Sequence, residues 1–422
     1  MANSLAVTFQ NKVLLPGLFF RAARIFLLVL VIIMPWEAVT AAREIAMALA
    51  AAFLALDLSF SKQRTFRPGP LFWPLVLYAL AAAMSLIWAV DFAYSLRELR
   101  AEVLKGLVIF YTGFHFLENE DNARQLWSTF LVGLAIMVVA GIVMFFMDGG
   151  SLTTHAVRAG SLHNGYGSLS TYLVTVWPFL FLAPRVVKAP KPWVTWPVFF
   201  GLTLFLVFMT YSRSAWLAIT ALSCLGLFLL SKKRLRAALI MVIGFFLVVA
   251  VLFTLPGSRH GESWDALFEE PGQVGGTTGD LLTLWHFSYE QMKQRPFQGI
   301  GLGRHSFSKS FPEFRRTHQP LLWHAHNMFV DLALQTGVQG LAAILLIFAV
   351  LVWCLWPNSP PAKGNWLSCF SMAGFLSVVG YAMRNLTDDF FCDDSSLMFW
   401  LVAGLALAAR QARQKYKRAT FE

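Results

Sequence analysis

The stretch WHAHNMFVDLALQTG, Trp323 to Gly337, places two histidines, an asparagine and an aspartate at the start of an otherwise apolar segment. A histidine that is neutral near pH 7 can take a proton from a hydroxyl group, so His326, which Asn327 follows directly, is a candidate general base. His324 could instead cap the next helix or anchor it at a membrane surface. A metal site with Asp331 is disfavoured, because an H-x-H pair on a helix points about 200° apart.

Charged residues that could assist this base lie in other parts of the chain. Arg213 stands in the short turn of YSRSAW between two apolar segments, where its planar guanidinium could hold an anion through two hydrogen bonds. The same position also suits an arginine that anchors a helix end to lipid headgroups. In RNLTDDFFCDD, Arg384 precedes Asp388 and Asp389, and these two acids could equally be solvated loop residues.

Composition predicts the setting of these residues. Of 422 residues, 57% are hydrophobic and 14% are charged, whereas a soluble domain carries about a quarter charged residues. The net charge of +11 sits mostly in short clusters between apolar runs. Such clusters orient a membrane protein, so no nucleic-acid partner is expected. Most of the cysteines lie inside apolar segments, so neither a disulfide framework nor a cysteine metal site is expected.

Apolar segments long enough to cross roughly 30 Å of hydrocarbon as helices of about 20 residues recur along the whole chain. Open sheet cannot satisfy its backbone in lipid, and these runs do not alternate as barrel strands do. We therefore predict an all-α polytopic membrane protein, a single transmembrane domain over residues 1–422, with about twelve spans. The predicted segments are 25–41, 45–60, 71–90, 105–118, 127–147, 168–184, 193–212, 214–231, 237–256, 338–356, 366–384 and 396–410.

Clusters of Lys and Arg predict which side of the membrane each connection faces. They occur in SKQRTFR, RVVKAPK, SKKRLR and the tail RQARQKYKR. The positive-inside rule places these segments and both termini in the cytoplasm, and the acidic connection ENEDNAR weighs little in that rule. The other connections, including a large loop over 257–325, then face the periplasm or exterior. That side also receives Arg213, His326 and Asp388.

The large loop is expected to contain short helices and turns. Asp280 is placed to cap a helix through LLTLWHFSYEQMKQ, which Pro296 ends. The stretch GIGLG, Gly299 to Gly303, lacks the G-x-G-x-x-G spacing, and no strand precedes it. We therefore expect tight turns that pack the loop onto the membrane domain, and no nucleotide site.

Several motifs resemble the O-antigen ligase family. They are SRSAW after an apolar span, RPFQGIGLG in the large loop, and HAHNMFVDLALQTGVQG entering the next span, and SLIWAVDFAYSLRELR extends the likeness over about residues 80–400. Many members have an arginine in a pattern like R-L-x-x-W, whereas here Leu281 stands four residues before Trp285. The family's second essential arginine is therefore one of Arg259, Arg295 and Arg304, with Arg295 ranked first.

The resemblance implies an O-antigen ligase, a glycosyltransferase of the bacterial inner membrane that acts in lipopolysaccharide biosynthesis. It would move a polysaccharide from undecaprenyl diphosphate onto the lipid A-core oligosaccharide at the periplasmic face, among membrane lipids. Arg213 and Arg295 would neutralise the leaving diphosphate without a metal or other cofactor, and His326 would deprotonate the acceptor hydroxyl for an inverting displacement. The expected supporting residues are His324, Asn327, Asp388, Asp389, Arg384, Arg304 and Arg259.

Two alternatives stay open. An O-antigen polymerase or a protein O-oligosaccharyltransferase of the same superfamily would use the same donor with a different acceptor. A membrane transporter could have as many spans, but transporters usually place binding residues near the bilayer midplane on broken helices, often in repeated halves. Here the polar candidates gather at one face, which favours the enzyme.

Reporter fusions test the predicted topology. Fusions after Lys233 and Arg418 should report a cytoplasmic position, and fusions near Gly275 and Asp393 a periplasmic one, because the Lys/Arg clusters set the orientation. Alkaline phosphatase and green fluorescent protein fusions at each point make the measurement. A cytoplasmic signal near Gly275 would remove the large loop from the predicted side.

Overall fold

The computed structural model describes residues 2–61, 64–152, 157–163, 165–231, 243–244, 277–317 and 322–419. The described residues form helices and no strand. Eight of these helices are long and apolar enough to cross a membrane, and Phe72–Trp88 forms a shorter apolar helix. The predicted all-α polytopic membrane fold is therefore confirmed.

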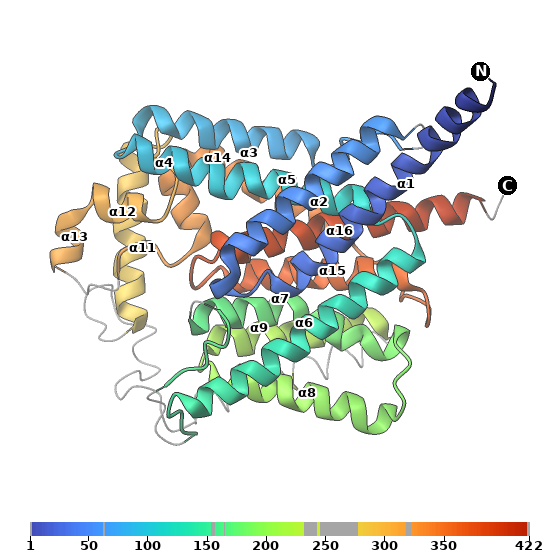
Figure 1. Ribbon diagram of the computed structural model, residues 1–422. Coiled ribbons are helices and arrows are strands. Elements are labelled where there is room, and N and C mark those ends of the chain that lie inside the picture. Colours follow the sequence, from blue (N-terminus) through green and yellow to red (C-terminus); the bar gives the residue numbers. More distant parts are fainter. Residues whose placement is uncertain are drawn as a thin grey trace.

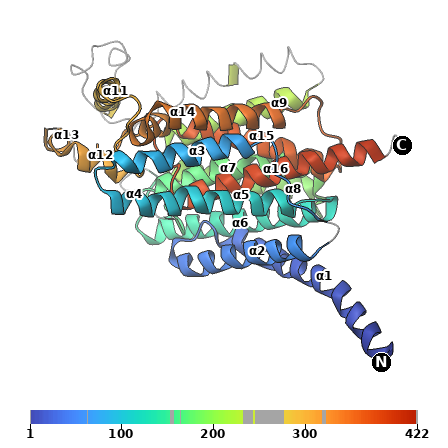
Figure 2. The ribbon, with the colours of Figure 1, turned by 90° about the horizontal axis from the view of Figure 1, so that it is seen from above.

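The long helices lie side by side, with the short helices of the large loop at one end (Figures 1 and 2). The first half contains α1 (Ala2–Ile33), α2 (Thr40–Phe60), α3 (Phe72–Ser85), α4 (Phe92–Glu98), α5 (Lys105–Phe116), α6 (Glu120–Met147), α7 (Tyr166–Val186), α8 (Pro192–Met209) and α9 (Arg213–Leu230). The large loop supplies α11 (Thr277–Gln294), α12 (His305–Ser310) and α13 (Pro312–Thr317). The chain then forms α14 (Met328–Leu355), α15 (Trp366–Arg384) and α16 (Asp393–Ala419).

Three short helical segments, η1 (Glu37–Val39), η2 (Leu86–Trp88) and η3 (Leu99–Leu104), complete the described helices. The last is a π-helix that joins α4 to α5. Eleven of the predicted apolar segments coincide with helices. Of the remaining one, 237–256, only residues 243–244 are described, so the number of spans stays a prediction.

The centre of the bundle is formed by α7, α15 and α16, whose residues are mostly buried. Helix α16 packs closely against α5 because glycines remove side chains at their contact. A Cβ atom at Gly404 would lie 2.2 Å from the carbonyl oxygen of Phe110. Helices such as α3 and α8 expose large apolar side chains, including Trp73 and Trp193, as a lipid-facing surface requires.

One end of the bundle collects both chain termini and the described parts of the basic connections, on the right of Figure 1. Arg64 Nε lies 2.9 Å from Glu118 Oε2, and Arg67 Nη1 donates to Gln411 Oε1 at 3.5 Å. Glu118 belongs to the acidic connection ENEDNAR, which interrupts the basic pattern in the sequence. Arg64 and Arg67 of the neighbouring basic cluster neutralise the charge of Glu118. The acidic connection can therefore lie at the same end of the bundle as the basic ones.

The first described helix of the large loop is α11, and its first residue differs from the predicted one. The helix begins at Thr277, so Asp280 lies inside the first turn and the prediction that it caps the helix is wrong. A carboxylate in the first turn still interacts favourably with the helix dipole. The helix ends at Gln294, shortly before Pro296, as predicted.

The GIGLG stretch forms tight turns against α14, as predicted. Gly299, Gly301 and Gly303 have φ angles of 68°, 97° and 106°, a region that glycine adopts without a Cβ penalty. A Cβ atom at Gly299 would lie 2.4 Å from the carbonyl oxygen of Gln335, so the backbones meet too closely for a side chain. These contacts hold the next residue, Arg304, at the end of the bundle.

Candidate active site

Asn327 is the residue that starts α14 and ties it to a neighbouring loop. Its side-chain oxygen accepts hydrogen bonds from the amides of Phe329 and Val330, at 3.0 and 3.3 Å. Its Nδ2 donates to the carbonyl of Leu386 at 2.9 Å. Asn327 is therefore the helix cap, and the expectation that His324 caps this helix is wrong.

The carboxylate of Asp331 holds the turn that carries the histidines. One oxygen accepts from the amide of Ala325 at 2.9 Å, and the other lies 3.0 Å from His324 Nδ1. On the outer side of the turn, Trp285 Nε1 donates to the carbonyl of Ala325 at 2.8 Å. Asp331 is fully buried, so these bonds are made in a low-dielectric environment where they are strong and costly to lose.

The tautomer of His324 follows from its two neighbours. Its Nδ1 lies 3.0 Å from Asp331 Oδ2 and 3.2 Å from the amide nitrogen of His326. One ring nitrogen cannot donate to the first and accept from the second at the same time. We assign the proton to Nδ1, because a bond to a carboxylate is the stronger of the two. Nε2 of His324 then lies 3.8 Å from Asp388 Oδ1.

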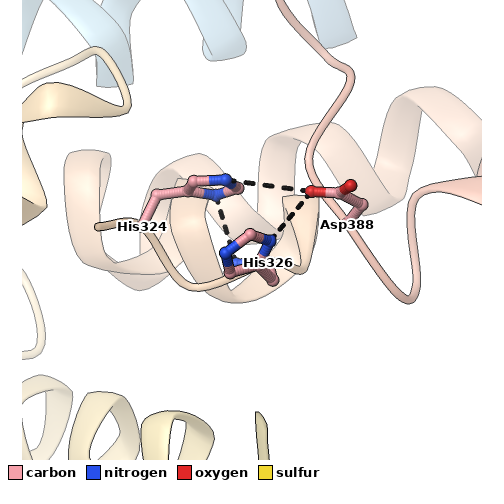
Figure 3. A group of neighbouring side chains, drawn as sticks. All are labelled: His324, His326 and Asp388. Carbon is pink, nitrogen blue, oxygen red and sulfur yellow. Dashed lines mark hydrogen bonds and ion pairs between the residues drawn. The ribbon is translucent and has the colours of Figure 1, made fainter. Parts of the chain in front are cut away.

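His326 stands beside His324 and contacts the same acid (Figure 3). Its Nδ1 lies 3.1 Å from Asp388 Oδ1, and the two imidazole centroids are 4.0 Å apart. The expectation that the two rings point apart is wrong, because they lie in a turn before α14 begins and not on a helix. His326 has a φ of 47°, which is uncommon for a residue with a side chain and is often found at functional sites.

The ionisation of Asp388 determines which nitrogen of His326 is the base. Burial opposes the charged form, but the hydrogen bond with His326 and the positive charge of Arg384 outweigh it, so the pKa of Asp388 is lowered. An ionised carboxylate only accepts, so Nδ1 of His326 carries the proton and Nε2 the lone pair. The His326 side chain is 22% exposed, which leaves the ring accessible to a substrate.

The pKa of Asp389, the next residue in the chain, is shifted in the opposite direction from that of Asp388. It is 4% exposed, so the interpretation as a solvated loop acid is wrong for this residue. Burial, with a further contribution from the charge of Asp331, raises the pKa of Asp389 to about 6. Its side-chain Oδ1 accepts from the amide of Phe391 at 2.9 Å, which stiffens the loop behind His326.

Two of the candidate arginines reach this loop. Arg304 Nη1 donates to the carbonyl of Asp389 at 3.2 Å, and its guanidinium lies 5.3 Å from the centroid of the Trp323 ring. Arg384 is 3% exposed at the end of α15, where it lies over the ring of Phe390. Both therefore flank the segment that holds His326.

The other candidate arginines are placed differently. Arg295 is exposed just before Pro296, whose carbonyl accepts from Val338 at 2.8 Å. That position lies about ten residues, or roughly 15 Å, along α14 from the histidine turn. Arg213 is the first residue of α9, whose Leu222 packs against Gly380 of α15, one turn before Arg384. Arg259 lies outside the described residues.

Sequence reasoning did not identify two contacts. The sequence suggests Asp331 only as a metal ligand beside the histidines, whereas in the structure its carboxylate is the partner of His324 Nδ1. No motif in the sequence points to Arg158, whose guanidinium lies 4.4 Å from the centroid of the Tyr166 ring. No rule of sequence spacing relates a residue in a turn to a residue in the helix that follows, so neither contact could be predicted. The only signal in the sequence is that Arg158 is an arginine in a connection predicted to face outward.

The same side chains have a geometry that could hold a metal ion. His324, His326 and Asp388 each offer one ligand atom within 4.8 Å of the others, and so do His324, Asp331 and Asp389. Nitrogen and carboxylate ligands of this kind suit Zn²⁺. In the described structure, however, both Asp331 and Asp388 already hydrogen-bond a histidine ring.

Fold and site together define a polytopic membrane protein with a carboxylate-held histidine at one end of its bundle. The family model described as O-antigen ligase matches residues 198–345, a range that contains Arg213, Arg304, His324 and His326. Over that range the chain is similar to the O-antigen ligase family, in agreement with the resemblance of its motifs. No curated protein matches the chain in a sequence comparison.

The raised pKa of Asp389 predicts a pH-dependent stability. Its folded-state pKa of about 6 exceeds the unfolded value of about 3.9, so the folded protein binds this proton more tightly. Stability should therefore be highest below pH 4 and fall as the pH rises to about 6, by up to about 3 kcal/mol. Asp389→Asn should flatten that fall, because the amide keeps the Phe391 bond and does not titrate.

Unfolding midpoints in detergent between pH 4.5 and 7.5 make the measurement. Asp148→Asn is the matched control, because it removes one exposed acid from the end of α6. Its pH curve should run parallel to that of the wild type. Parallel curves for Asp389→Asn and the wild type would contradict the assigned burial of this carboxyl group.

Proposed function

We propose that the protein is an O-antigen ligase that transfers polysaccharide from undecaprenyl diphosphate to the lipid A-core oligosaccharide. The observation that carries this proposal is the contact of His326 Nδ1 with Asp388 at 3.1 Å, because it leaves a basic Nε2 on an accessible ring. The match of residues 198–345 to the O-antigen ligase family model supports a glycosyl transfer with lipid-linked polysaccharide.

The proposed reaction is a single displacement. Nε2 of His326 takes the proton of the acceptor hydroxyl while that oxygen attacks the anomeric carbon of the donor sugar. The bond between this carbon and the diphosphate oxygen breaks, and the diphosphate leaves with the electron pair. Asp388 keeps the imidazole in the correct tautomer and stabilises the imidazolium that forms, as a carboxylate does beside other catalytic histidines. The configuration at the anomeric carbon is inverted.

The leaving diphosphate needs fixed positive charge. Arg213 is proposed to supply part of it, because it starts α9, a helix that packs against α15 near Arg384. Arg295 stays a prediction as the second arginine, although it lies about 15 Å along α14 from that turn. Arg304 is engaged with Asp389 and Asp393, so we propose that it positions the loop that holds His326.

The orientation in the membrane follows from the two ends of the bundle. We propose that the protein is a multi-pass protein of the bacterial inner membrane, with both termini in the cytoplasm and the site facing the periplasm. In support, the termini and the described parts of the basic connections share one end, and α11–α13 lie at the other (Figure 1). A site at the membrane surface can receive two lipid-anchored substrates laterally.

Lipopolysaccharide profiles of a deletion strain test the function. The strain should lose long polymer on lipid A-core and accumulate lipid-linked polymer. The wild-type gene should restore the profile, and His326→Ala should not, because loss of a general base slows transfer by about 10²–10⁴-fold. His286→Ala is the matched control: it removes an exposed histidine of α11 and should restore normal ligation.

Other profiles would identify the alternatives. Chains with a single repeat on lipid A-core would show a polymerase, and loss of glycan from a protein would show a protein O-oligosaccharyltransferase. Normal ligation by His326→Ala at wild-type protein levels would overturn the assigned base.

The proposed transfer does not use a metal ion. Fixed arginines can neutralise the departing diphosphate in place of a divalent cation. Purified protein with lipid-linked polymer and lipid A-core should therefore remain active in excess chelator, provided that the acceptor stays dispersed. If low Zn²⁺ or Mg²⁺ restores a transfer that chelation has stopped, with acceptor dispersion unchanged, His324, His326 and Asp388 bind a metal and the arginine mechanism is wrong.

A further inference from the structure

We propose that Arg185, Arg410 and Arg413 form a binding site for the headgroup of an anionic phospholipid, at the end of the bundle that holds both chain termini (Figure 1). This site is separate from the histidine turn. Arg185 lies in the last turn of α7, whereas Ser170, near the start of that helix, contacts Arg384. Binding of this lipid is therefore independent of the proposed glycosyl transfer.

The loop that joins α14 to α15 brings two of the arginines together. Arg185 Nη2 donates to the carbonyl of Pro361 at 2.9 Å, and Arg410 Nη1 donates to the carbonyl of Trp356 at 2.8 Å. In return, the amide of Gly364 donates to the carbonyl of Arg185 at 2.9 Å. The loop thus connects the end of α7 to α16 and holds both guanidinium groups in place.

Arg413 adds a third positive charge beside this loop. It lies one turn after Arg410 on α16 and interacts electrostatically with it. Arg413 and Arg185 both interact electrostatically with Cys369, in the first turn of α15. Like charges one turn apart on a helix repel each other, so an anion that binds here would relieve this repulsion.

The acidic residue of this region is engaged elsewhere. Glu120, at the start of α6, also interacts with Cys369. Its Oε2 accepts from the amides of Trp366 and Leu367, at 2.7 and 3.3 Å, and so stabilises the start of α15. Within the part of the chain that the structure describes, none of the three arginines forms an ion pair with a carboxylate. In the same part, the buried Nε of Arg185 has no hydrogen-bond partner.

Exposed tryptophans place these charges at the depth of the lipid headgroups. Trp353 lies in the last turn of α14 and Trp356 follows that helix, and their side chains are 83% and 45% exposed. Tryptophan gathers at the boundary between hydrocarbon and headgroups. Further along α14, the exposed side chains of Leu345 and Leu346 offer an apolar surface to acyl chains. A lipid can therefore contact the arginines and the helix at the same time.

The chemistry of the ligand follows from the unused donors. A guanidinium has five N–H donors and can hold a phosphate through two parallel hydrogen bonds. The backbone carbonyls of the loop occupy only one donor each of Arg185 and Arg410. A zwitterionic headgroup would bring its own cation into a cluster that is already positive. A headgroup with net negative charge, such as that of phosphatidylglycerol, fits better, and basic sites between helices at a membrane surface bind such lipids.

Native mass spectrometry of the full-length protein, titrated with lipid in detergent, tests the site. The wild type should retain one phosphatidylglycerol about tenfold more tightly than phosphatidylcholine with the same acyl chains. Arg185→Gln and Arg413→Gln should each weaken that binding about tenfold, because each removes a planar pair of donors. Arg418→Gln is the matched control: it removes the same charge from an exposed position further along α16, and its affinity should equal that of the wild type.

Unfolding temperatures separate a lipid site from a purely structural role. Without added lipid, Arg413→Gln should unfold at the wild-type temperature or above, because it relieves repulsion with Arg410. Phosphatidylglycerol should raise the unfolding temperature of the wild type but not of this variant.

Three results would overturn the proposal. Equal affinities of Arg413→Gln and Arg418→Gln would show that diffuse positive charge attracts the lipid. Displacement of phosphatidylglycerol by excess inorganic phosphate would show a site for a free anion. A lower unfolding temperature of Arg413→Gln with unchanged lipid affinity would show that this arginine only stabilises the fold.

Discussion

The buried carboxylate of Asp331 is the constraint on which the geometry of the site depends. It binds both the ring of His324 and the backbone of Ala325, so the turn before α14 has one conformation. A left-handed residue such as His326 costs of order 1 kcal/mol or more and persists only where its surroundings determine it. Here Asp331 on one side and Trp285 on the other provide those surroundings, and the ring of His326 is presented to Asp388.

Beyond these hydrogen bonds of Asp331 and Trp285, acidic residues, histidines and arginines alternate across the end of the bundle. Asp331 contacts His324, whose ring lies beside that of His326. Asp388 contacts both histidines, and the positive charge of Arg384 favours its ionised form. In a low-dielectric setting each charge needs a partner of opposite sign. The alternation satisfies most of them from within the chain, although Nε of Arg384 has no hydrogen-bond partner among the described residues.

The membrane explains why this chemistry is concentrated at one end. Within the hydrocarbon, helices pack through apolar side chains and glycine contacts such as Gly404 on Phe110. Loops that enter that depth would leave backbone groups unsatisfied. Polar groups therefore gather where helices end, and the turns of GIGLG and the segment after α15 bring distant parts of the chain to the same place.

The sequence by itself determined the fold class, the positions of eleven of the predicted apolar segments and the presence of the histidine motif, because apolar runs of membrane-spanning length and short motifs are local signals. It also predicts that Arg213, His326 and Asp388 lie in connections on the same side of the membrane. Only the tertiary structure decided that His324 and His326 face each other in a turn, that Asn327 and not a histidine caps α14, and that Arg384 and Arg158 approach α7 while Arg295 does not. These outcomes depend on backbone angles in turns and on contacts between helices far apart in the chain, which no periodicity in the sequence records.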